Sequence, residues 1–460
     1  MISPKKMKFY GLRDVDNMPQ LQRLSEEQRF EIKVVANVLP FRVNNYVIEE
    51  LIDWQNIPDD PIFNLTFMRK EMLNEDQFNR MADALLHSSQ EEIKNVINEI
   101  RFELNPHPAG QMTLNVPLID DKPVPGIQRK YRETALIFPS AGQTCHSYCT
   151  FCFRWAQFVG INDFKFATDE SKRFQDYLKA QTEVTDILLT GGDPMIMSAK
   201  NLAAYIEPFL QPEFAHIRNI RIGTKSISYW PYKYLTDKDA DDILRLFEKV
   251  INSGKHIAIM AHFNHWKELS TDASHLAISR IRNTGVQIRT QSPLVKHIND
   301  DADVWAKMWK EQVKLGCIPY YFFVERNTGS EEYFEVPLYR AYQIYREAYK
   351  KVSGLSRTVR GPSMSALPGK IAIEGVSEIN GEKVFVLTML QARNPDWVKR
   401  PFFAKFNENA TWINELRPAF GKDKFFYQDE LNQMIRENQG QMYFKKSDEY
   451  IYDESLNADD

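Results

Sequence analysis

The sequence has few cysteines, no long apolar run and no large excess of charge of either sign. Four cysteines in 460 residues are consistent with reduced thiols in the reducing cytosol. No apolar run reaches membrane-spanning length, and the first residues lack the apolar core of a signal peptide. The net charge of −4 gives no reason to expect nucleic acid or an anionic membrane as partner. We therefore expect a cytoplasmic protein that binds neither.

Internal repeats and low-complexity linkers are also missing. An apolar content of 43% and a charged content of 26% are typical of a soluble globular protein, and the length allows one large or two to three ordinary domains. Changes in pattern along the chain predict three regions. These are a helical region over 1–115, a strand–helix region over 116–370 and a C-terminal extension over 371–460.

The sequence pattern of the first region predicts helices. Ser25 and Gln28 form a capping box that opens a helix ended by Pro40. Further helices are expected near 44–53, 76–86 and 89–103. From the sequence we interpret this region as a mere helical cap on the rest.

Strand-like apolar runs and amphipathic segments alternate through the second region. The runs occupy residues 134–139, 186–191, 219–224, 256–263, 286–292 and 318–325. The amphipathic segments occupy residues 171–180, 199–209, 237–252, 272–284, 302–315 and 338–351. This alternation predicts an α/β fold with a parallel sheet and right-handed crossovers, and six units form a partial (βα)6 TIM-like barrel. Chemistry is then expected at the carboxyl ends of the strands.

The last region changes pattern again. Residues 371–390 predict a hairpin turning at Asn380-Gly381, and a helix is expected near 427–437. The extension is thus predicted to be α+β, and its polar end, ESLNADD, to be disordered.

Three of the four cysteines lie close together. Cys145, Cys149 and Cys152 have the spacing C-x3-C-x2-C, which suits a shared metal better than disulfides. Three thiolates are one fewer than the four that usually close an iron–sulfur cluster or a structural zinc site. A four-iron cluster held in this way leaves one iron open to another ligand. Two alternatives are three buried cysteines on one helical face, and zinc completed by His146 or Cys317.

A second motif, Gly191-Gly192-Asp193-Pro194, ends the second strand-like run. The glycines allow close backbone approach, and Asp193 can accept hydrogen bonds from an ammonium or hydroxyl group. Taken alone, the stretch is also an ordinary strand-to-helix turn.

The ordered set of motifs resembles the lysine 2,3-aminomutase family of radical S-adenosylmethionine (SAM) enzymes. The set is CxxxCxxCFR (145–154), GGDP (191–194), RIGTK (221–225), HFNH (262–265), TQSPL (290–294), PYYFF (319–323) and Gly369-Lys370. The resemblance implies a radical SAM partial barrel with a [4Fe-4S] cluster, SAM and pyridoxal 5′-phosphate. It also implies an isomerase that moves an amino group between neighbouring carbons of an amino acid. A low-potential donor such as flavodoxin or ferredoxin would be a partner.

The resemblance assigns roles to individual residues. Cluster ligands match Cys145, Cys149 and Cys152. SAM-side residues match Phe151, Gly191, Gly192 and Asp193. A polar residue on the cofactor side matches Gln291, the arginine that holds the substrate α-carboxylate matches Arg154, and the lysine that holds pyridoxal phosphate matches Lys370. An arginine's planar fork suits a carboxylate, and a lysine in that role must be partly desolvated.

Three positions depart from the lysine-specific members of the family. Where those members hold the substrate side-chain ammonium with an aspartate, this chain has Arg326. A second aspartate is replaced by Arg360 or Ser363, depending on where the gap is placed. An arginine on the phosphate side is replaced by Thr134, with Arg132 and Lys130 as the alternatives.

The first departure predicts a different substrate. An arginine would repel a lysine ammonium and attract a carboxylate, so we expect an acidic or neutral amino acid, with glutamate first. The alternative is an outward Arg326 paired with Glu331 or Glu332. Residues 355–370 also resemble the bacterial aminomutase that rearranges a lysine used to modify elongation factor P.

Two other functions remain open from the sequence. One is a radical SAM enzyme without pyridoxal phosphate, and the other is an iron–sulfur or zinc binding protein. The zinc-binding C-terminal cysteines of some family members are missing, because no cysteine follows Cys317. A homo-oligomer would need another contact, such as the aromatic residues of 397–406, for which core packing is the favoured interpretation.

Overall fold

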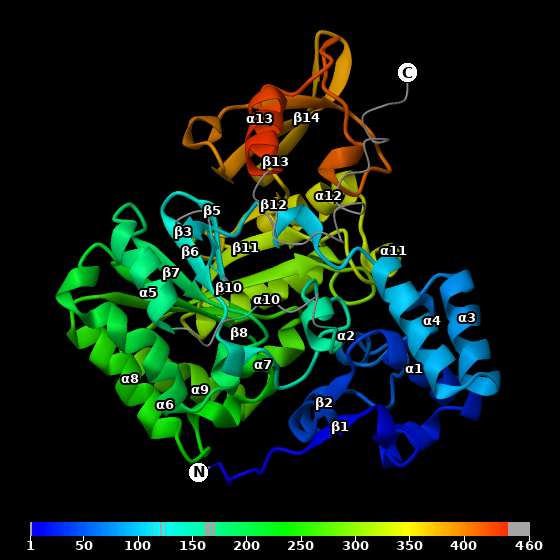
Figure 1. Ribbon diagram of the computed structural model, residues 1–460. Helices are drawn as coiled ribbons and strands as arrows, with labels where there is room; N and C mark the ends of the chain where they lie inside the picture. Colours follow the sequence, from blue (N-terminus) through cyan, green and yellow to red (C-terminus); the bar gives the residue numbers. More distant parts are fainter. Residues whose placement is uncertain are drawn as a thin grey trace.

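Six parallel strands, each followed by a helix, form the centre of an eleven-stranded sheet in the computed structural model (Figure 1). They are β6 (Thr134–Ile137), β7 (Asp186–Leu189), β8 (Asn219–Thr224), β9 (His256–His262), β10 (Gln287–Leu294) and β11 (Ile318–Val324). A seventh parallel strand, β12 (Arg360–Ser365), pairs with β11. Since the sheet order is linear from β5 to β15, the parallel strands do not close on themselves. The predicted α/β partial barrel is confirmed.

The structure describes residues 2–112, 114–119, 122–124, 126–161, 167 and 171–439. The predicted disordered end of the chain lies outside these residues. No helix in the described ranges combines the length and apolarity that crossing a bilayer requires.

Helices cover the outer face of the parallel strands. They are α5 (Ser171–Ala180), α6 (Ala199–Ile206), α8 (Ala240–Asn252), α9 (Asp272–Asn283), α10 (Ala302–Lys314) and α12 (Leu338–Lys350), and short α7 (Ser226–Tyr229) and α11 (Glu331–Phe334) follow β8 and β11. Phe322 of β11 packs against Trp305 of α10, with ring centroids 4.2 Å apart. Because strand side chains alternate, Tyr321 and Phe323 lie on the opposite, inner face of the sheet.

The N-terminal region contains α1 (Glu26–Val38), α2 (Pro61–Thr66), α3 (Glu75–His87) and α4 (Gln90–Glu103). The predicted Ser25–Gln28 capping box opens α1. The predicted helix near 44–53 is wrong in part: β2 (Arg42–Asn44) pairs there with β1 (Phe9–Gly11), and a π-helix follows over Val47–Leu51. Cross-strand hydrogen bonds outweigh local helix propensity in that stretch.

The interpretation of this region as a mere cap is also wrong. Its buried side chains form one apolar cluster with Phe151, Trp155, Tyr229 and Trp230, which belong to the barrel. The N-terminal region therefore helps to build the barrel around the cysteines.

The C-terminal extension continues the sheet of the barrel. Strand β13 (Gly369–Ile379) runs antiparallel to β12, and the hairpin partner β14 (Glu382–Ala392) pairs with β15 (Phe402–Lys405). Asn380 and Gly381 have φ values of 52° and 79°, as a type I′ turn requires, so the predicted hairpin is confirmed. Helix α13 (Gln428–Gln439) packs on this hairpin. At the opposite edge the large sheet ends with β5 (Ile127–Tyr131). Strands β3 (Leu118–Ile119) and β4 (Lys122–Pro123) form a separate two-stranded sheet.

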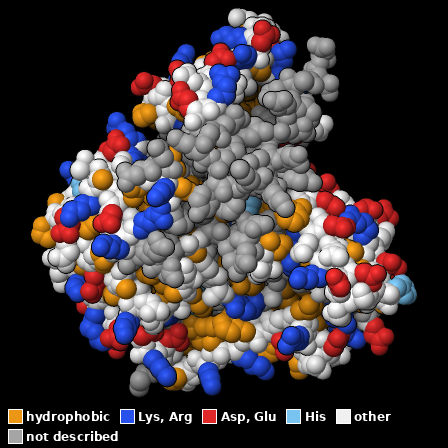
Figure 2. Space-filling model, viewed as in Figure 1, with side chains coloured by type: hydrophobic (Ala, Val, Ile, Leu, Met, Phe, Trp, Pro, Cys, Tyr) orange, Lys and Arg blue, Asp and Glu red, His pale blue; other side chains and the backbone are white. Residues whose placement is uncertain are grey.

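The aromatic residues of the extension mostly pack inward. Trp397 and Phe402 are buried in an apolar cluster with Phe425 and Tyr427. Core packing, the favoured interpretation from the sequence, is confirmed for these two residues. On the face shown in Figure 2, cationic and anionic side chains are interspersed over the described surface.

Asp60 joins the N-terminal region to the barrel and provides a stability test. It is fully buried, accepts hydrogen bonds from the backbone N–H groups of Ile62 and Phe63, both at 2.9 Å, and pairs with Lys267 at 2.5 Å. Asp60→Ala removes a helix cap and leaves a partly buried cation unpaired. We expect it to lower the free energy of unfolding by about 3 kcal/mol.

Urea unfolding followed by circular dichroism measures this loss. Asp16→Ala is the matched control, because Asp16 forms an exposed pair with Lys33 and its removal should cost less than about 1 kcal/mol. Equal midpoints for the two variants would contradict the structural role of Asp60.

Candidate active site

The three clustered cysteines lie in a loop that begins at the carboxyl end of β6. Turns rather than a helix shape the loop: the Cys152 N–H donates to the Cys149 carbonyl at 3.1 Å, and the Trp155 N–H to the Cys152 carbonyl at 3.0 Å. The alternative of three cysteines on one helical face is therefore wrong. All three thiols are half-buried.

Side chains and backbone of the N-terminal region hold this loop from outside the barrel. Arg42 of β2 donates to the Cys145 carbonyl at 2.5 Å and also to the Thr144 hydroxyl. Asn44 donates to the His146 carbonyl at 3.0 Å, and the Thr150 hydroxyl donates to the Asn64 carbonyl of α2 at 2.7 Å. The polar groups of the loop thus have fixed partners, and its shape does not depend on a metal alone.

The Gly191-Gly192-Asp193 turn holds the same loop from inside the barrel. A Cβ added to Gly192 would lie 2.4 Å from the Thr144 nitrogen, and Gly191 has a φ of +138°, so neither position accepts a side chain without a shift. The Asp193 N–H donates to the Thr144 carbonyl at 2.7 Å. The end of β7 therefore fixes the position of Cys145.

The Asp193 carboxylate is fully engaged within the protein. It accepts from the Met195 N–H at 2.9 Å, the Thr224 hydroxyl at 2.6 Å and the Lys225 N–H at 2.9 Å, with His146 Nδ1 3.7 Å away. Burial would raise the pKa of Asp193, but these donors hold it below its usual value. In this structure the carboxylate ties β7, β8 and the cysteine loop together.

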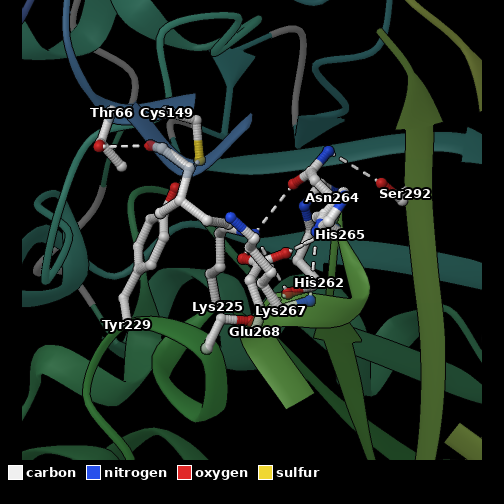
Figure 3. A network of polar contacts seen from close by, with 12 residues as sticks. Thr66, Cys149, Lys225, Tyr229, His262, Asn264, His265, Lys267, Glu268 and Ser292 are labelled. Carbon is white, nitrogen blue, oxygen red and sulfur yellow. Dashed lines mark hydrogen bonds and ion pairs between the residues drawn. The ribbon is translucent and has the colours of Figure 1, made fainter. Parts of the chain in front are cut away.

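A buried polar network lies beside Cys149 (Figure 3). Lys225 Nζ donates to Glu268 at 2.5 Å and to the Asn264 side chain at 2.9 Å, and it lies 4.7 Å above the Tyr229 ring. The Tyr229 hydroxyl is 3.3 Å from the Cys149 sulfur. These residues belong to or follow the RIGTK and HFNH motifs, which had no assigned role from sequence.

Burial keeps the thiols protonated as long as no metal binds them. Burial, with smaller contributions from neighbouring charges, raises the pKa of Cys149 to about 11 and that of Cys152 to about 12. A metal displaces such protons, because a coordinating thiol is deprotonated outright. Within the described residues, no group of three or more His, Cys, Asp or Glu side chains could hold a single metal ion.

The zinc alternative lacks a fourth ligand. His146 Nδ1 faces Asp193, and Cys317 precedes β11 at the amino end of the strands, opposite the cysteine loop. Three thiolates on a firmly held loop fit the predicted four-iron cluster with one open iron.

The remaining SAM-side residues lie near the same end of the barrel. Phe151 is buried, with its ring centroid 6.4 Å from that of His262 and 6.3 Å from that of Phe334. Gln291 of β10 is half-buried and lies between His262 of β9 and Tyr321 of β11 in the sheet register.

Two arginines meet over one aromatic ring. The Arg154 guanidinium lies 4.9 Å and the Arg326 guanidinium 4.8 Å from the centre of Phe153. Burial and the charge of Arg326 lower the pKa of Arg154 to about 9, and the buried Nη1 of Arg154 has no hydrogen-bond partner among the described residues. Arg154 is buried and Arg326 half-buried, so an anion between them would stabilise both cations.

Arg326 is directed into the barrel. It donates to the Ser365 carbonyl at 3.0 Å, in the segment that leads to Lys370, and burial lowers its pKa. Among the described residues, Arg326 forms no ion pair with Glu331 or Glu332, so that alternative is wrong.

Lys370 extends this cationic group along β13. Its Nζ lies 3.9 Å above the Tyr321 ring, and burial, followed by the charges of Arg221, Arg360 and Arg326, lowers its pKa well below the usual value. A lowered pKa makes the neutral, nucleophilic form of the lysine amine easier to reach.

The positions that depart from the family pattern have different surroundings. Lys130 of β5 donates to the Ala366 carbonyl and lies among the charges of Lys370, Arg326 and Arg393, whereas Arg132 is exposed and pairs with Glu133 at 2.9 Å. Of the two alternatives to the missing phosphate-side arginine, only Lys130 lies inside.

Arg360 and Ser363, the two candidates for the second replaced aspartate, also lie in different surroundings. Arg360 stacks on Tyr321 at 4.3 Å and adds to the charge around Lys370. Ser363 is fully buried, and its hydroxyl lies 3.5 Å from the Phe322 carbonyl.

Several residues of the site were not identified from the sequence. Glu325 is buried next to Arg326, and burial raises its pKa well above the usual value. The sequence signal that could have identified Glu325 is its position at the end of the strand-like run 318–325, directly before Arg326. Arg42 and Asn44 carried no motif, and only their contacts reveal them.

The contact between Gly192 and Thr144 provides a direct test. Gly192→Ala should displace the cysteine loop, because the new Cβ would overlap the Thr144 backbone. We expect iron and sulfide content after anaerobic reconstitution to fall at least about tenfold while the circular dichroism spectrum is retained. Gly354→Ala is the matched control, since nothing lies within 4 Å of its added Cβ. Full iron content in Gly192→Ala would refute this role.

Sequence comparison with curated proteins places the chain among aminomutases. It is 29% identical over 412 residues to "Putative L-lysine 2,3-aminomutase" of Aquifex aeolicus, covering 89% of this chain and 95% of that protein. It is 27% identical to the L-lysine 2,3-aminomutase of Clostridium subterminale, over 51% of this chain and 53% of that protein. The glutamate 2,3-aminomutase of Clostridioides difficile is 24% identical, over 75% of this chain and 69% of that protein.

No family model matches the chain. The similarity to aminomutases nevertheless extends over most of its length, and the chain spans about half of the Clostridium subterminale relative. The family expected from the cysteine, glycine and lysine motifs is the one that the relatives share. Over most of its length the chain is therefore similar to proteins of the lysine 2,3-aminomutase type.

Proposed function

We propose that the protein is a 2,3-aminomutase that acts on an acidic or neutral amino acid, glutamate first, and depends on pyridoxal phosphate. The observation that carries the proposal is the pair of inward guanidiniums, Arg154 and Arg326, over Phe153. Two cations in this position suit a substrate with two carboxylates and repel a side-chain ammonium.

The residues present fit the three cofactors. Cys145, Cys149 and Cys152 would hold the cluster, Lys370 would hold pyridoxal phosphate, and Lys130 lies on the side where its phosphate would need a cation. When bound, these groups supply one-electron chemistry and stabilise charge on the amino-bearing carbon. An external one-electron donor, such as flavodoxin or ferredoxin, is part of the proposal.

Each protein side chain contributes a specific task. Arg154, whose Nη1 has no hydrogen-bond partner among the described residues, would donate to the α-carboxylate through its planar fork. Arg326, fixed by the Ser365 carbonyl, would donate to the side-chain carboxylate. The Phe153 ring limits water near Arg154 and Arg326, and the rings of Tyr321 and Phe323 limit water near Lys370. Less water strengthens each electrostatic contact. The substrate would thus be held at both ends.

The proposed covalent attachment of pyridoxal phosphate to Lys370 can be tested. Borohydride treatment of the protein loaded with pyridoxal phosphate should trap one covalent cofactor on Lys370, located by peptide mass spectrometry. Lys370→Ala should show no trapped cofactor and should lack the Schiff-base contribution to the visible spectrum, because the proposed imine needs the Lys370 amine. Lys238→Ala, at an exposed position, is the control and should be trapped normally.

Trapping at another lysine, or none in the wild-type protein, would favour the radical SAM function without pyridoxal phosphate. Iron analysis and SAM cleavage are measured in parallel. A loss of the trapped cofactor would therefore be distinguished from a loss of the cluster.

The choice of substrate is tested by reversing the charge at Arg326. An ion pair at about 4 Å contributes about 4 kcal/mol at an effective dielectric of about 20, so Arg326→Asp should lower kcat/KM for glutamate at least about a hundredfold. An anaerobic assay that separates α- and β-amino acids over the twenty amino acids measures this change. Arg340→Asp, on the exposed face of α12, is the control.

Unchanged turnover of glutamate in Arg326→Asp, or wild-type preference for lysine, would refute the proposed substrate. Arg326→Lys separates charge from geometry. It keeps the cation but loses the planar fork, and we expect intermediate activity.

A further inference from the structure

Among the described residues, Cys149 is the clustered cysteine whose sulfur has a side-chain hydrogen-bond partner. The Tyr229 hydroxyl lies 3.3 Å from its sulfur (Figure 3), whereas Cys152 accepts from the backbone N–H of Arg154. Tyr229 is 1% exposed. A single side-chain oxygen therefore reaches one of the three sulfurs, and one substitution can remove it.

The neighbours of Tyr229 hold its ring in this position. Its backbone carbonyl accepts from Asn44 at 2.8 Å, and its N–H donates to the Lys225 carbonyl at 2.9 Å. The Lys225 ammonium lies 4.7 Å above the ring and is itself fixed by Glu268 and Asn264. The contact between the cation and the ring face helps to hold the ring where its hydroxyl reaches Cys149.

The direction of the hydrogen bond follows from metal chemistry. A thiolate that ligates iron carries no proton, so the hydroxyl must donate to the sulfur. Reduction of the cluster adds one electron and no proton, and the negative charge spreads onto the sulfurs. A donor to sulfur stabilises this reduced state more than the oxidised state, and such hydrogen bonds are among the factors that set cluster potentials.

We propose that Tyr229, braced by Lys225, donates a hydrogen bond to the Cys149 thiolate and raises the reduction potential of the cluster. The inference rests on the proposed cluster but not on the substrate or on pyridoxal phosphate. Tyr229 is a positioning residue that acts through Cys149. It would ease electron entry from the external donor.

The test compares reconstituted wild-type protein with Tyr229→Phe in an anaerobic redox titration followed by electron paramagnetic resonance. We expect the variant to keep its four irons and to be harder to reduce by about tenfold in the one-electron equilibrium, which is a shift of about 59 mV to more negative potential. Tyr46→Phe is the matched control: it removes a fully buried hydroxyl that contacts Thr271 and no cysteine, and its potential should equal that of the wild type.

A second measurement compares the same two proteins. After exchange into D2O, pulsed electron paramagnetic resonance of the reduced wild-type cluster should detect an exchangeable deuteron close to a ligand sulfur that is missing in Tyr229→Phe, whereas the deuteron on the Arg154 amide near Cys152 should remain in both. An unchanged potential in Tyr229→Phe with full iron content, or no such deuteron in the wild type, would overturn this inference alone. Absence of a four-iron cluster from the wild type would instead refute the proposed function.

Discussion

The close approach of two backbone segments, the turn after β7 and the cysteine loop, is the constraint on which the site depends. Gly192 has no room for a Cβ against Thr144, and the Asp193 N–H completes the contact at 2.7 Å. Because Asp193 also accepts from β8 through Thr224 and Lys225, the loop is fixed to two neighbouring strands at once. The cysteines consequently occupy a defined place at the carboxyl end of the sheet, where parallel α/β folds gather their chemistry.

The opposite wall of the barrel is governed by charge rather than by backbone contact. Arg326, Arg360, Lys130 and Lys370 lie within reach of one another's fields, and the nearby Glu325 is too deeply buried to compensate them as a carboxylate. Their aromatic neighbours exclude water without supplying charge. Burying like charges together lowers the stability of the folded protein, and a bound anion offsets this loss. Anion binding at this wall therefore stabilises the folded protein.

Much of the fold follows from local patterns, whereas the support of the site does not. Hydrophobic periodicity predicted the six strand–helix units and the capping box at Ser25, since each depends on residues close in sequence. The inward direction of Arg326 and the bond from Arg42 to the Cys145 carbonyl join segments that are distant in the chain. No periodicity encodes such contacts. The same reason explains why residues 42–44 form a strand: their partner is at residues 9–11.

The cysteine-loop side and the cationic side of the barrel differ in how well they tolerate substitutions. A substitution at Gly192, Asp193 or Asn44 disturbs backbone that positions the cysteines, so its effect spreads to the whole site. Arg326 is attached to its surroundings by one hydrogen bond to a carbonyl and by contact with Phe153, and Arg360 by stacking on tyrosines. Replacing either changes the charge offered to a ligand while leaving the loop contacts intact. A fold built in this way can keep one reaction centre and exchange the substrate that it accepts.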